Sequence, residues 1–373
     1  MGPDAARRPA ILLVGYALTA GGGETFPIFL ANELRRRNWP VSFLDCALEE
    51  GEPAIRNLLR ANVPLYQMAD QADVGPLCCR LGTEVVHSCH ATTDLLVSRG
   101  LALLPKDSRP RHVVTLHGMY ETLNLDSLLV HLSQVKAVDQ FVYTASKNLS
   151  SFPKQFREAS RFTRIPNALP VTTTVSRDRS ELGLGTDGVT VAMLISRAIP
   201  EKGWQVAVEA VEDARVASGR DIHLVLIGNG PIYDEMRAMS VPPWLHLLGV
   251  QGDIRSWIAV ADVGLLPSTF AGESYPLVLI DFLTMGVPVI TSAAGEIPQM
   301  MACELGSPGF IVDETDPIQI REQMTEHLTA FVTLDAHDRE ALRERARAAS
   351  AKFSFDDMVD AYEQVYEHIC SRP

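Results

Sequence analysis

Residues 10–37 read AILLVGYALTAGGGETFPIFLANELRRR, and this stretch decides the fold. Ala10–Tyr16 is a compact apolar run, Gly21-Gly22-Gly23-Glu24 forms a turn, and the sequence that follows is compatible with a helix to about Arg37. Short continuous apolar strands that alternate with helices are typical of a parallel sheet covered on both faces. The stretch therefore predicts an α/β unit that begins with a buried strand.

The same alternation of strand and helix occurs twice along the chain. In the first part the expected strands are Ala10–Tyr16, Val41–Asp45, Glu84–Ser88, His112–Leu116 and Asp139–Thr144, and Ile165-Pro166-Asn167 closes the unit. In the second part they are Val189–Ile195, Ile222–Ile227, Trp244–Leu248, Val263–Leu266 and Val287–Thr291. Helices are expected at Gly203–Ala217, Pro231–Met239, Ile254–Ala261 and Tyr275–Met285. The fold class is therefore α/β, with two Rossmann-like doubly wound parallel-sheet domains that face a cleft.

The boundary between the two domains is expected in the polar segment 170–188, which includes Thr172–Thr174. Residues 1–170 form the first domain and residues 171–373 the second. The final segment, Asp356–Ile369, has apolar residues spaced so that they share one helix face. A helix at 355–370 can therefore pack back onto the first domain.

Charge is distributed unevenly over the two domains. The formal net charge is −13, of which residues 1–170 contribute +2 and residues 171–373 contribute −15. This balance argues against nucleic-acid binding, which needs a concentrated basic surface. The run Arg35-Arg36-Arg37 is interpreted as a solvated helix end, with an anionic acceptor or a membrane surface as the alternative.

Cysteines and hydropathy indicate the compartment. The six cysteines include no metal-type C-x-x-C pair, so reduced structural thiols are expected. No apolar run approaches the roughly 20 residues of a membrane span. We therefore expect a cytoplasmic protein with at most peripheral membrane contact.

Several turns at strand ends carry residues suited to an anionic ligand. Gly22 and Gly23 leave backbone N–H groups accessible at a helix start, although a tight structural turn accounts for them equally well. Arg197 ends a strand and Lys202 precedes a helix, an arrangement that favours a diphosphate clamp over surface charges. Gly228 begins Gly228-Asn229-Gly230-Pro231 at a turn from a strand to a helix. Its lack of a side chain either keeps a cleft open to a ligand or serves only the turn, and both roles are equally supported.

The richest segment is Glu273-Ser274-Tyr275-Pro276-Leu277-Val278-Leu279-Ile280-Asp281. We expect a helix that begins near Ser274, with Glu273 at its mouth and Asp281 two turns in. Backbone N–H groups of Ser274, Tyr275 and Leu277 can then receive a phosphate, whereas Pro276 has none to give. Two carboxylates can bind hydroxyl groups, and the backbone amides beside them can bind phosphate. This combination suits a nucleotide sugar.

Histidines end two of the strands expected in the first domain. His117 follows the strand at 112–116, where it can hydrogen-bond a sugar or phosphate oxygen, so a functional and a structural role are equally supported. His87 and His90 end an earlier strand and are secondary candidates, because a buried structural role accounts for them as well.

These motifs together resemble a known family. Arg197, Glu201-Lys202-Gly203, Gly228-Asn229-Gly230-Pro231 and Glu273-x7-Asp281 occur in the order and spacing of the retaining GT-B glycosyltransferases of family four (glycosyl transferases group 1). Met285-Gly286-Val287-Pro288, Ile165-Pro166-Asn167 and the N-terminal Gly-Gly-Gly-Glu loop belong to the same pattern. The resemblance is strong over roughly residues 160–300. The first domain matches mainly in architecture and at a few turns.

The resemblance implies roles for individual residues. Arg197 and Lys202 would hold the donor diphosphate, Glu273 would contact the transferred sugar, and Asp281 would hold the ribose hydroxyls. Gly22 and Gly23 would line the phosphate side of the cleft, and His117 would approach the sugar near the reacting centre. The family usually has Glu where this chain has Asp281, so the ribose carboxylate here is about one methylene shorter.

The resemblance therefore implies transfer of a sugar from a nucleoside diphosphate sugar to an acceptor hydroxyl with retention of configuration, in carbohydrate biosynthesis. The first domain would bind the acceptor, which is a saccharide, a lipid-linked intermediate or a small molecule, and the second would bind the donor. No acidic metal-binding motif stands out, so no metal requirement is expected. Two alternatives remain: a nucleotide-sugar epimerase on the same scaffold and a non-catalytic nucleotide-sugar-binding subunit.

Overall fold

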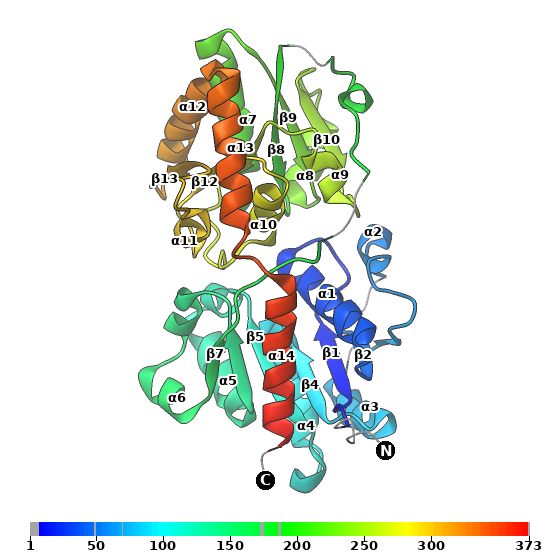
Figure 1. Cartoon of the computed structure of the whole chain (residues 1–373). Helices are drawn as coiled ribbons and strands as arrows, with labels where there is room; N and C mark the ends of the chain where they lie inside the picture. Colours follow the sequence, from blue (N-terminus) through cyan, green and yellow to red (C-terminus); the bar gives the residue numbers. More distant parts are fainter. Residues whose placement is uncertain (1–6, 48–49, 69, 172–174, 186–187, 372–373) are drawn as a thin grey trace. The chain divides into compact units, whose positions relative to one another are not determined.

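A computed structural model of the chain describes residues 7–47, 50–68, 70–171, 175–185 and 188–371. The described residues up to Pro170, together with those from Phe355 onward, form unit 1, and those between Val171 and Ser354 form unit 2 (Figure 1). Each unit is described by itself below. Thr172–Thr174 of the predicted linker lie outside the described residues.

Unit 1 is a parallel sheet of seven strands in the order β3-β2-β1-β4-β5-β6-β7. The strands are β1 (Ile11–Gly15), β2 (Val41–Asp45), β3 (Leu65–Gln67), β4 (Val85–Ser88), β5 (Arg111–Leu116), β6 (Gln140–Tyr143) and β7 (Phe162–Arg164). The helices are α1 (Gly22–Arg36), α2 (Pro53–Arg56), α3 (Val74–Leu81), α4 (Ala91–Ala102), α5 (Leu125–Gln134), α6 (Lys154–Ala159) and α14 (Phe355–Cys370). The order of the strands reverses between β1 and β4, which is where a doubly wound sheet places its ligand crevice.

Unit 2 is a parallel sheet of six strands in the order β10-β9-β8-β11-β12-β13. The strands are β8 (Val189–Ile195), β9 (Asp221–Ile227), β10 (Leu245–Gly249), β11 (Val263–Leu266), β12 (Val289–Ser292) and β13 (Gly309–Val312). The helices are α7 (Trp204–Ser218), α8 (Pro231–Ala238), α9 (Ile254–Ile258), α10 (Leu277–Thr284), α11 (Ile297–Met301), α12 (Pro317–Thr333) and α13 (Ala336–Ser350). Here the order reverses between β8 and β11.

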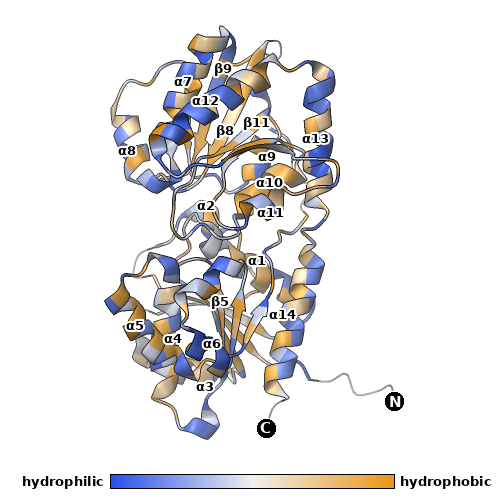
Figure 2. Ribbon diagram, turned by 90° about the vertical axis from the view of Figure 1, so that its left-hand side faces the viewer, coloured by the Kyte–Doolittle hydropathy of each residue, from blue (hydrophilic) through white to orange (hydrophobic). Residues whose placement is uncertain are grey.

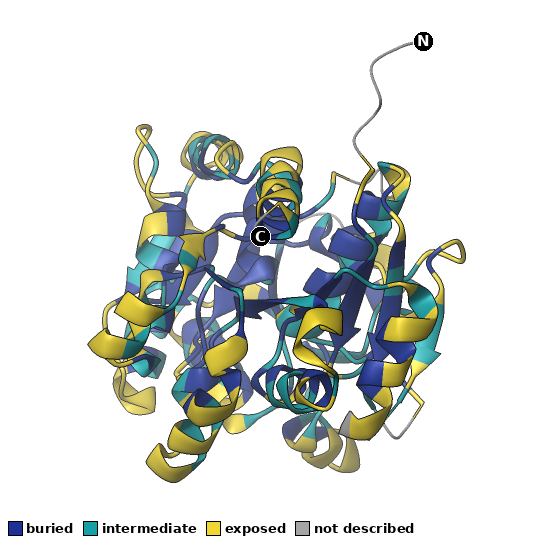
Figure 3. Ribbon diagram, turned by 90° about the horizontal axis from the view of Figure 1, so that it is seen from below, coloured by how far each residue is buried: buried dark blue, intermediate teal, exposed yellow. Residues whose placement is uncertain are grey.

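Hydrophobic residues are concentrated in the strands of both units (Figure 2), and the strands are mostly buried (Figure 3). β1 and β8 illustrate this, because all five residues of β1 and six of the seven residues of β8 are buried. Buried strands of this kind are continuous apolar runs, which is why the sequence indicates them. The sequence prediction omits β3, β7 and β13, and the first two of these have only three residues each and include polar ones.

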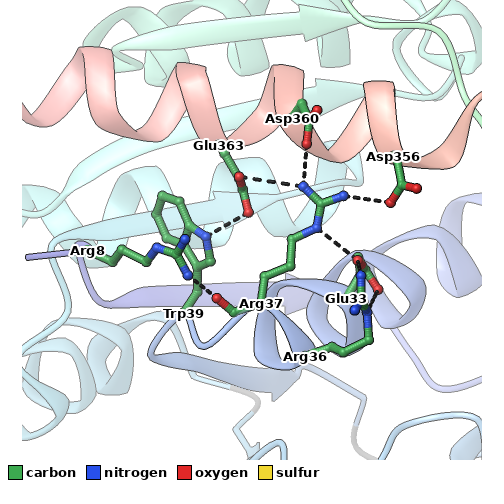
Figure 4. Close-up of polar contacts among 8 residues, drawn as sticks. All are labelled: Arg8, Glu33, Arg36, Arg37, Trp39, Asp356, Asp360 and Glu363. Atoms are coloured by element: carbon green, nitrogen blue, oxygen red, sulfur yellow. Dashed lines mark hydrogen bonds and ion pairs between the residues drawn. The ribbon is translucent and has the colours of Figure 1, made fainter. Parts of the chain in front are cut away.

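The C-terminal helix α14 is anchored in unit 1 by Arg37, the C-cap residue of α1 (Figure 4). Nη2 of Arg37 lies 2.7 Å from Oδ1 of Asp356, and the same guanidinium pairs with Asp360 and Glu363 of α14. Nε1 of Trp39 donates to Oε1 of Glu363 at 2.7 Å. The interpretation of the arginine run at the end of α1 as a solvated helix end is therefore wrong for Arg37, whose side chain is only 17% exposed.

A second, buried set of contacts holds α14 against β4 and β5. The ring of His87 bonds the Tyr366 hydroxyl through Nδ1 and the Thr115 hydroxyl through Nε2, both at 2.7 Å, and Thr115 lies 3.1 Å from the Tyr362 hydroxyl. Burial lowers the pKa of His87 to about 3, so the ring is neutral at physiological pH. Of the two roles considered for His87, these contacts support the structural one.

Candidate active site

The candidate site in unit 2 forms where the strand order reverses. β8 and β11 are neighbours, with Val263 beside Ala192, so the loops that follow them leave the sheet at the same edge. The backbone N–H of Thr269 donates to the carbonyl of Glu201 at 2.8 Å and ties the two loops together. The segments that carry Arg197, Lys202 and Glu273 therefore meet.

Lys202 and Glu273 form a buried ion pair. Nζ of Lys202 lies 2.6 Å from Oε2 of Glu273, and the two side chains are 14% and 7% exposed. Gly203 makes this approach possible, because it has φ +70° and a β-carbon there would lie 2.5 Å from the carbonyl oxygen of Pro267. Two residues assigned to the diphosphate and to the sugar are thus in direct contact.

Phe270 joins Arg197 to this pair, although no sequence pattern singled it out. Its half-buried ring lies 4.8 Å from Lys202 Nζ and 5.4 Å from Arg197 Cζ. Within the described residues, the guanidinium of Arg197 makes this ring contact but no hydrogen bond or ion pair. A half-buried cation on an aromatic ring, with its donors unused, is suited to an anionic ligand.

Gly228 and Gly230 serve the packing of the site. A β-carbon at Gly228, which has φ +140°, would lie 1.9 Å from the carbonyl oxygen of Ser196, and one at Gly230 would lie 2.7 Å from that of Ala198. The buried Trp204 donates from Nε1 to the Ser196 hydroxyl at 2.9 Å. These contacts fix the backbone beside Arg197, so they support the structural role considered for Gly228.

The helix expected to begin near Ser274 begins later. α10 starts at Leu277 with Pro276 as its N-cap, so Glu273, Ser274 and Tyr275 belong to the preceding loop. The proline N-cap fixes an extended backbone, which keeps the residues before it out of the helix. The loop is held by Glu296, whose N–H donates to the Ser274 carbonyl at 2.9 Å.

Asp281 lies inside α10 and faces α9. Its Oδ1 accepts a hydrogen bond from Nε of Arg255 at 2.5 Å, and the two side chains are 7% and 10% exposed. Burial raises the pKa of Asp281 to about 6, although Arg255 acts to lower it. The sequence did not indicate Arg255 as a partner.

The residues predicted in unit 1 come together at the start of α1. Gly22 and Gly23 open the helix, and a β-carbon at Gly23 would lie 3.8 Å from Cβ of His117. The His117 ring packs on Phe26 with the ring centroids 4.6 Å apart, and Phe26 packs in turn on Tyr362 of α14 at 5.7 Å.

His117 is neutral and poised for a hydrogen bond. Desolvation lowers its pKa to about 3, with a smaller contribution from the nearby His90. Its Nε2 is buried and has no hydrogen-bond partner among the residues that the structure describes. His90 itself accepts from the Thr92 N–H at the start of α4 and stacks on Tyr16, which gives it a capping role.

The structure also bears on metal ions, thiols and membrane spans. In the described ranges, no three His, Cys, Asp or Glu side chains gather closely enough to hold a metal ion. The six cysteines form no disulfide in the structure. Among the described helices, none combines the length and hydrophobicity that a membrane span requires.

The two sheets, each with a reversal of strand order, have the architecture of the GT-B fold class. A crystal structure of Anabaena HepE in complex with UDP-glucose has this fold, with a TM-score of 0.76 at 17% identity, over 98% of this chain and 100% of that one. Residues 189–330 match the model of the family described as glycosyl transferases group 1.

Two curated relatives match over most of this chain. N-acetyl-alpha-D-glucosaminyl L-malate synthase of Bacillus anthracis is 25% identical over 81% of this chain and 79% of that protein. An exopolysaccharide phosphotransferase of Streptomyces coelicolor is 26% identical over 75% of this chain, which spans only 29% of that protein's length.

Proposed function

We propose that the protein transfers a sugar from a nucleoside diphosphate sugar to an acceptor hydroxyl with retention of anomeric configuration. The observation that carries this proposal is a cluster at the reversal of strand order in unit 2, in which Arg197 and Lys202 lie over the Phe270 ring and Glu273 pairs with Lys202. The cluster combines cations for a diphosphate with a carboxylate for sugar hydroxyls.

The departing diphosphate is the group that most needs stabilisation in such a reaction. Negative charge grows on its β-phosphate as the bond to the sugar breaks, and fixed cations stabilise that charge at little reorganisation cost. Arg197 donates no hydrogen bond to any residue that the structure describes, and Lys202 is already held in place by Glu273. The proposal assigns this stabilisation to Arg197 and Lys202 and includes no metal ion.

The proposed step needs only the donor and the acceptor as reactants. The bond from the anomeric carbon to the β-phosphate oxygen breaks, and a bond to the acceptor oxygen forms on the same face of the sugar. The acceptor proton passes to the departing phosphate. Glu273 would hold sugar hydroxyls, and the neutral His117, whose Nε2 lacks a partner among the described residues, would bond the sugar or the acceptor.

Support for the donor class comes from similar proteins. The Anabaena structure contains UDP-glucose, and the Bacillus relative is a glucosaminyl malate synthase by name. We therefore begin the donor series with UDP-glucose and UDP-N-acetylglucosamine. L-malate and short oligosaccharides begin the acceptor series.

A thermal-shift screen of nucleoside diphosphate sugars would identify the donor, since a ligand at 100 times its Kd stabilises a fold by about 2.7 kcal/mol. Transfer is then followed by NMR, which reports the anomeric configuration of the product. An inverted product would overturn retention. Donor incubated without acceptor provides the control, because a change of sugar stereochemistry there would indicate an epimerase, and binding without turnover a non-catalytic subunit.

A further inference from the structure

The pair of Arg255 and Asp281 is the feature of unit 2 that the proposed function leaves unexplained. Arg255 extends from the first turn of α9, directly after the N-cap Asp253, and reaches Asp281 in the middle of α10. Both side chains are about nine-tenths buried, and Nε and Oδ1 are 2.5 Å apart. A buried pair of this kind carries a desolvation cost, so it calls for a reason beyond stability.

The two carboxylate oxygens of Asp281 differ in their surroundings. Oδ1 accepts from Arg255, whereas Oδ2 accepts no hydrogen bond from any residue in the described part of the chain. Within the described ranges, the fully buried side-chain atoms without a partner include His117 Nε2 and Thr329 Oγ1 but not Oδ2 of Asp281. Oδ2 therefore keeps some accessible surface and is the oxygen that a ligand can reach.

The charged groups that act on Asp281 all come from α9 and its cap. Arg255 favours the carboxylate and Asp253 disfavours it. α13 also packs against α10, but its Arg347 lies against Gly286, beyond the carboxyl end of the helix. β12 (Val289–Ser292) contributes no titratable side chain. Arg255 is therefore the cation on which the charge of Asp281 depends.

We propose that Arg255 is a positioning residue for the donor: it fixes Oδ1 of Asp281 and so leaves Oδ2 to accept from the vicinal hydroxyls of the nucleotide ribose. This proposal rests on the proposed function and names a residue that the sequence pattern did not indicate. It also accounts for a short aspartate at this position, because an anchored carboxylate needs less reach than a free one. The consequence that is specific to Arg255 is that its loss weakens the preference for ribonucleotides over 2′-deoxyribonucleotides.

The rival interpretation is a purely structural ion pair between α9 and α10. Both interpretations predict that loss of Arg255 lowers the melting temperature, so stability alone does not separate them. The discrimination between ribose and deoxyribose, and its dependence on pH, does separate them. A structural pair has no effect on either quantity.

The experiment measures Kd by isothermal titration calorimetry for UDP, ADP and GDP and for their 2′-deoxy counterparts, between about pH 5 and about pH 9. The quantity compared is the Kd of the 2′-deoxy ligand divided by the Kd of the ribo ligand. Both ligands carry the same terminal phosphate, so the effect of its titration cancels in this ratio. The variants are Arg255→Met, Arg255→Lys, Arg255→Gln and Asp281→Asn. Arg321→Met is the matched control, since Arg321 pairs with Glu209 and Asp213 on α7, away from α10.

In the wild type we expect a ratio of roughly tenfold or more above about pH 7, because a carboxylate bond to a hydroxyl is lost in the deoxy ligand. The ratio should fall several-fold toward about pH 5, where Asp281 becomes protonated. In Arg255→Met the midpoint of this fall should move up by at least about one pH unit. Arg255→Lys should give a Kd ratio and a midpoint near those of the wild type. Asp281→Asn should give a low Kd ratio at every pH. The control Arg321→Met should leave both the ratio and the midpoint unchanged.

The proposal would be overturned if Arg255→Met kept the Kd ratio and the midpoint of the wild type. It would also be overturned if the wild-type protein bound nucleotides without discriminating between ribose and deoxyribose. If Arg255→Met does not fold, Arg255→Gln decides in the same way, because it keeps a hydrogen-bond donor but loses the charge. Failure of the proposed function looks different: no nucleotide or nucleotide sugar binds to the wild type at all, and this inference then falls with it.

Discussion

Nζ of Lys202 and Oε2 of Glu273 lie 2.6 Å apart, although the two residues are separated by 71 positions in the sequence. The fold of unit 2 itself brings the pair together, and Phe270 holds Lys202 from a second side. A lysine fixed in this way loses little rotamer freedom when a phosphate arrives, which is the advantage of a preorganised site.

Replacing either cation of the cluster should abolish most of the activity. Lys202→Ala and Arg197→Ala are each expected to lower the rate of transfer by about two orders of magnitude or more, because each removes one fixed charge from the leaving group. Initial rates of sugar transfer are the measurement. Arg220→Ala, at an exposed position of unit 2, is the control. Near-wild-type turnover in both variants would disprove the clamp.

Glu273→Gln should affect transfer more than nucleotide binding. The amide keeps the shape of the side chain but removes the negative charge near Lys202 and weakens the contact with sugar hydroxyls. We expect a fall in kcat of about tenfold or more, with the Kd for the free nucleoside diphosphate unchanged or lower. Weaker nucleotide binding with an unchanged kcat would contradict the sugar-facing role.

The fold could be predicted from the sequence because its central strands are buried on both faces. β1, β2 and β8 are apolar runs that match their predicted limits within a residue. The edge strands β3 and β7 carry no such pattern, because a three-residue strand with polar side chains resembles a loop. The start of α10 was misplaced because the helical pattern continues back to Tyr275, while Pro276 ends it.

The site was predictable only in part, for a related reason. Arg197, Lys202 and Glu273 lie in the loops that follow β8 and β11. The ends of these strands can be located from the sequence, so the residues that follow them can be named as candidates. Which side chains then touch depends on loop packing, such as the bond from Thr269 to Glu201, and no local pattern reports that packing. Phe270 and Arg255 were missed because a single aromatic or basic residue in a polar loop or a short helix usually serves packing or solvation.

Gly228→Ala provides a test of the structural role of this glycine. The added methyl group would lie 1.9 Å from the Ser196 carbonyl oxygen, and φ is +140°, so we expect a loss of about 2 kcal/mol or more in the free energy of unfolding. Urea denaturation measures this loss. Gly185→Ala is the control, because the corresponding β-carbon would meet nothing within 4 Å. Equal stability of both variants would contradict the packing argument.

Arg37→Ala should loosen α14 from unit 1. The guanidinium contacts Glu33, Asp356, Asp360 and Glu363, and its removal leaves four carboxylates without their shared cation. We expect a destabilisation of about 1–3 kcal/mol in urea, together with faster proteolysis near the C-terminus. Arg80→Ala, at an exposed position of the same unit, should have almost no effect. Unchanged proteolysis of the Arg37 variant would show that the buried contacts of Tyr362 and Tyr366 suffice.

Transfer should continue in the presence of a chelator. In the proposed mechanism Arg197 and Lys202 take the role that a divalent cation plays elsewhere, since both stabilise charge on the departing diphosphate. Activity measured after dialysis against EDTA should therefore equal that of untreated protein, and added Mg²⁺ or Mn²⁺ should not rescue Lys202→Ala. Loss of activity in EDTA that Mn²⁺ restores would mean that a metal shares the leaving-group charge. A clamp made only of Arg197 and Lys202 would then be incomplete, and the carboxylate of Glu273 would be the first ligand to examine, because it lies beside Lys202.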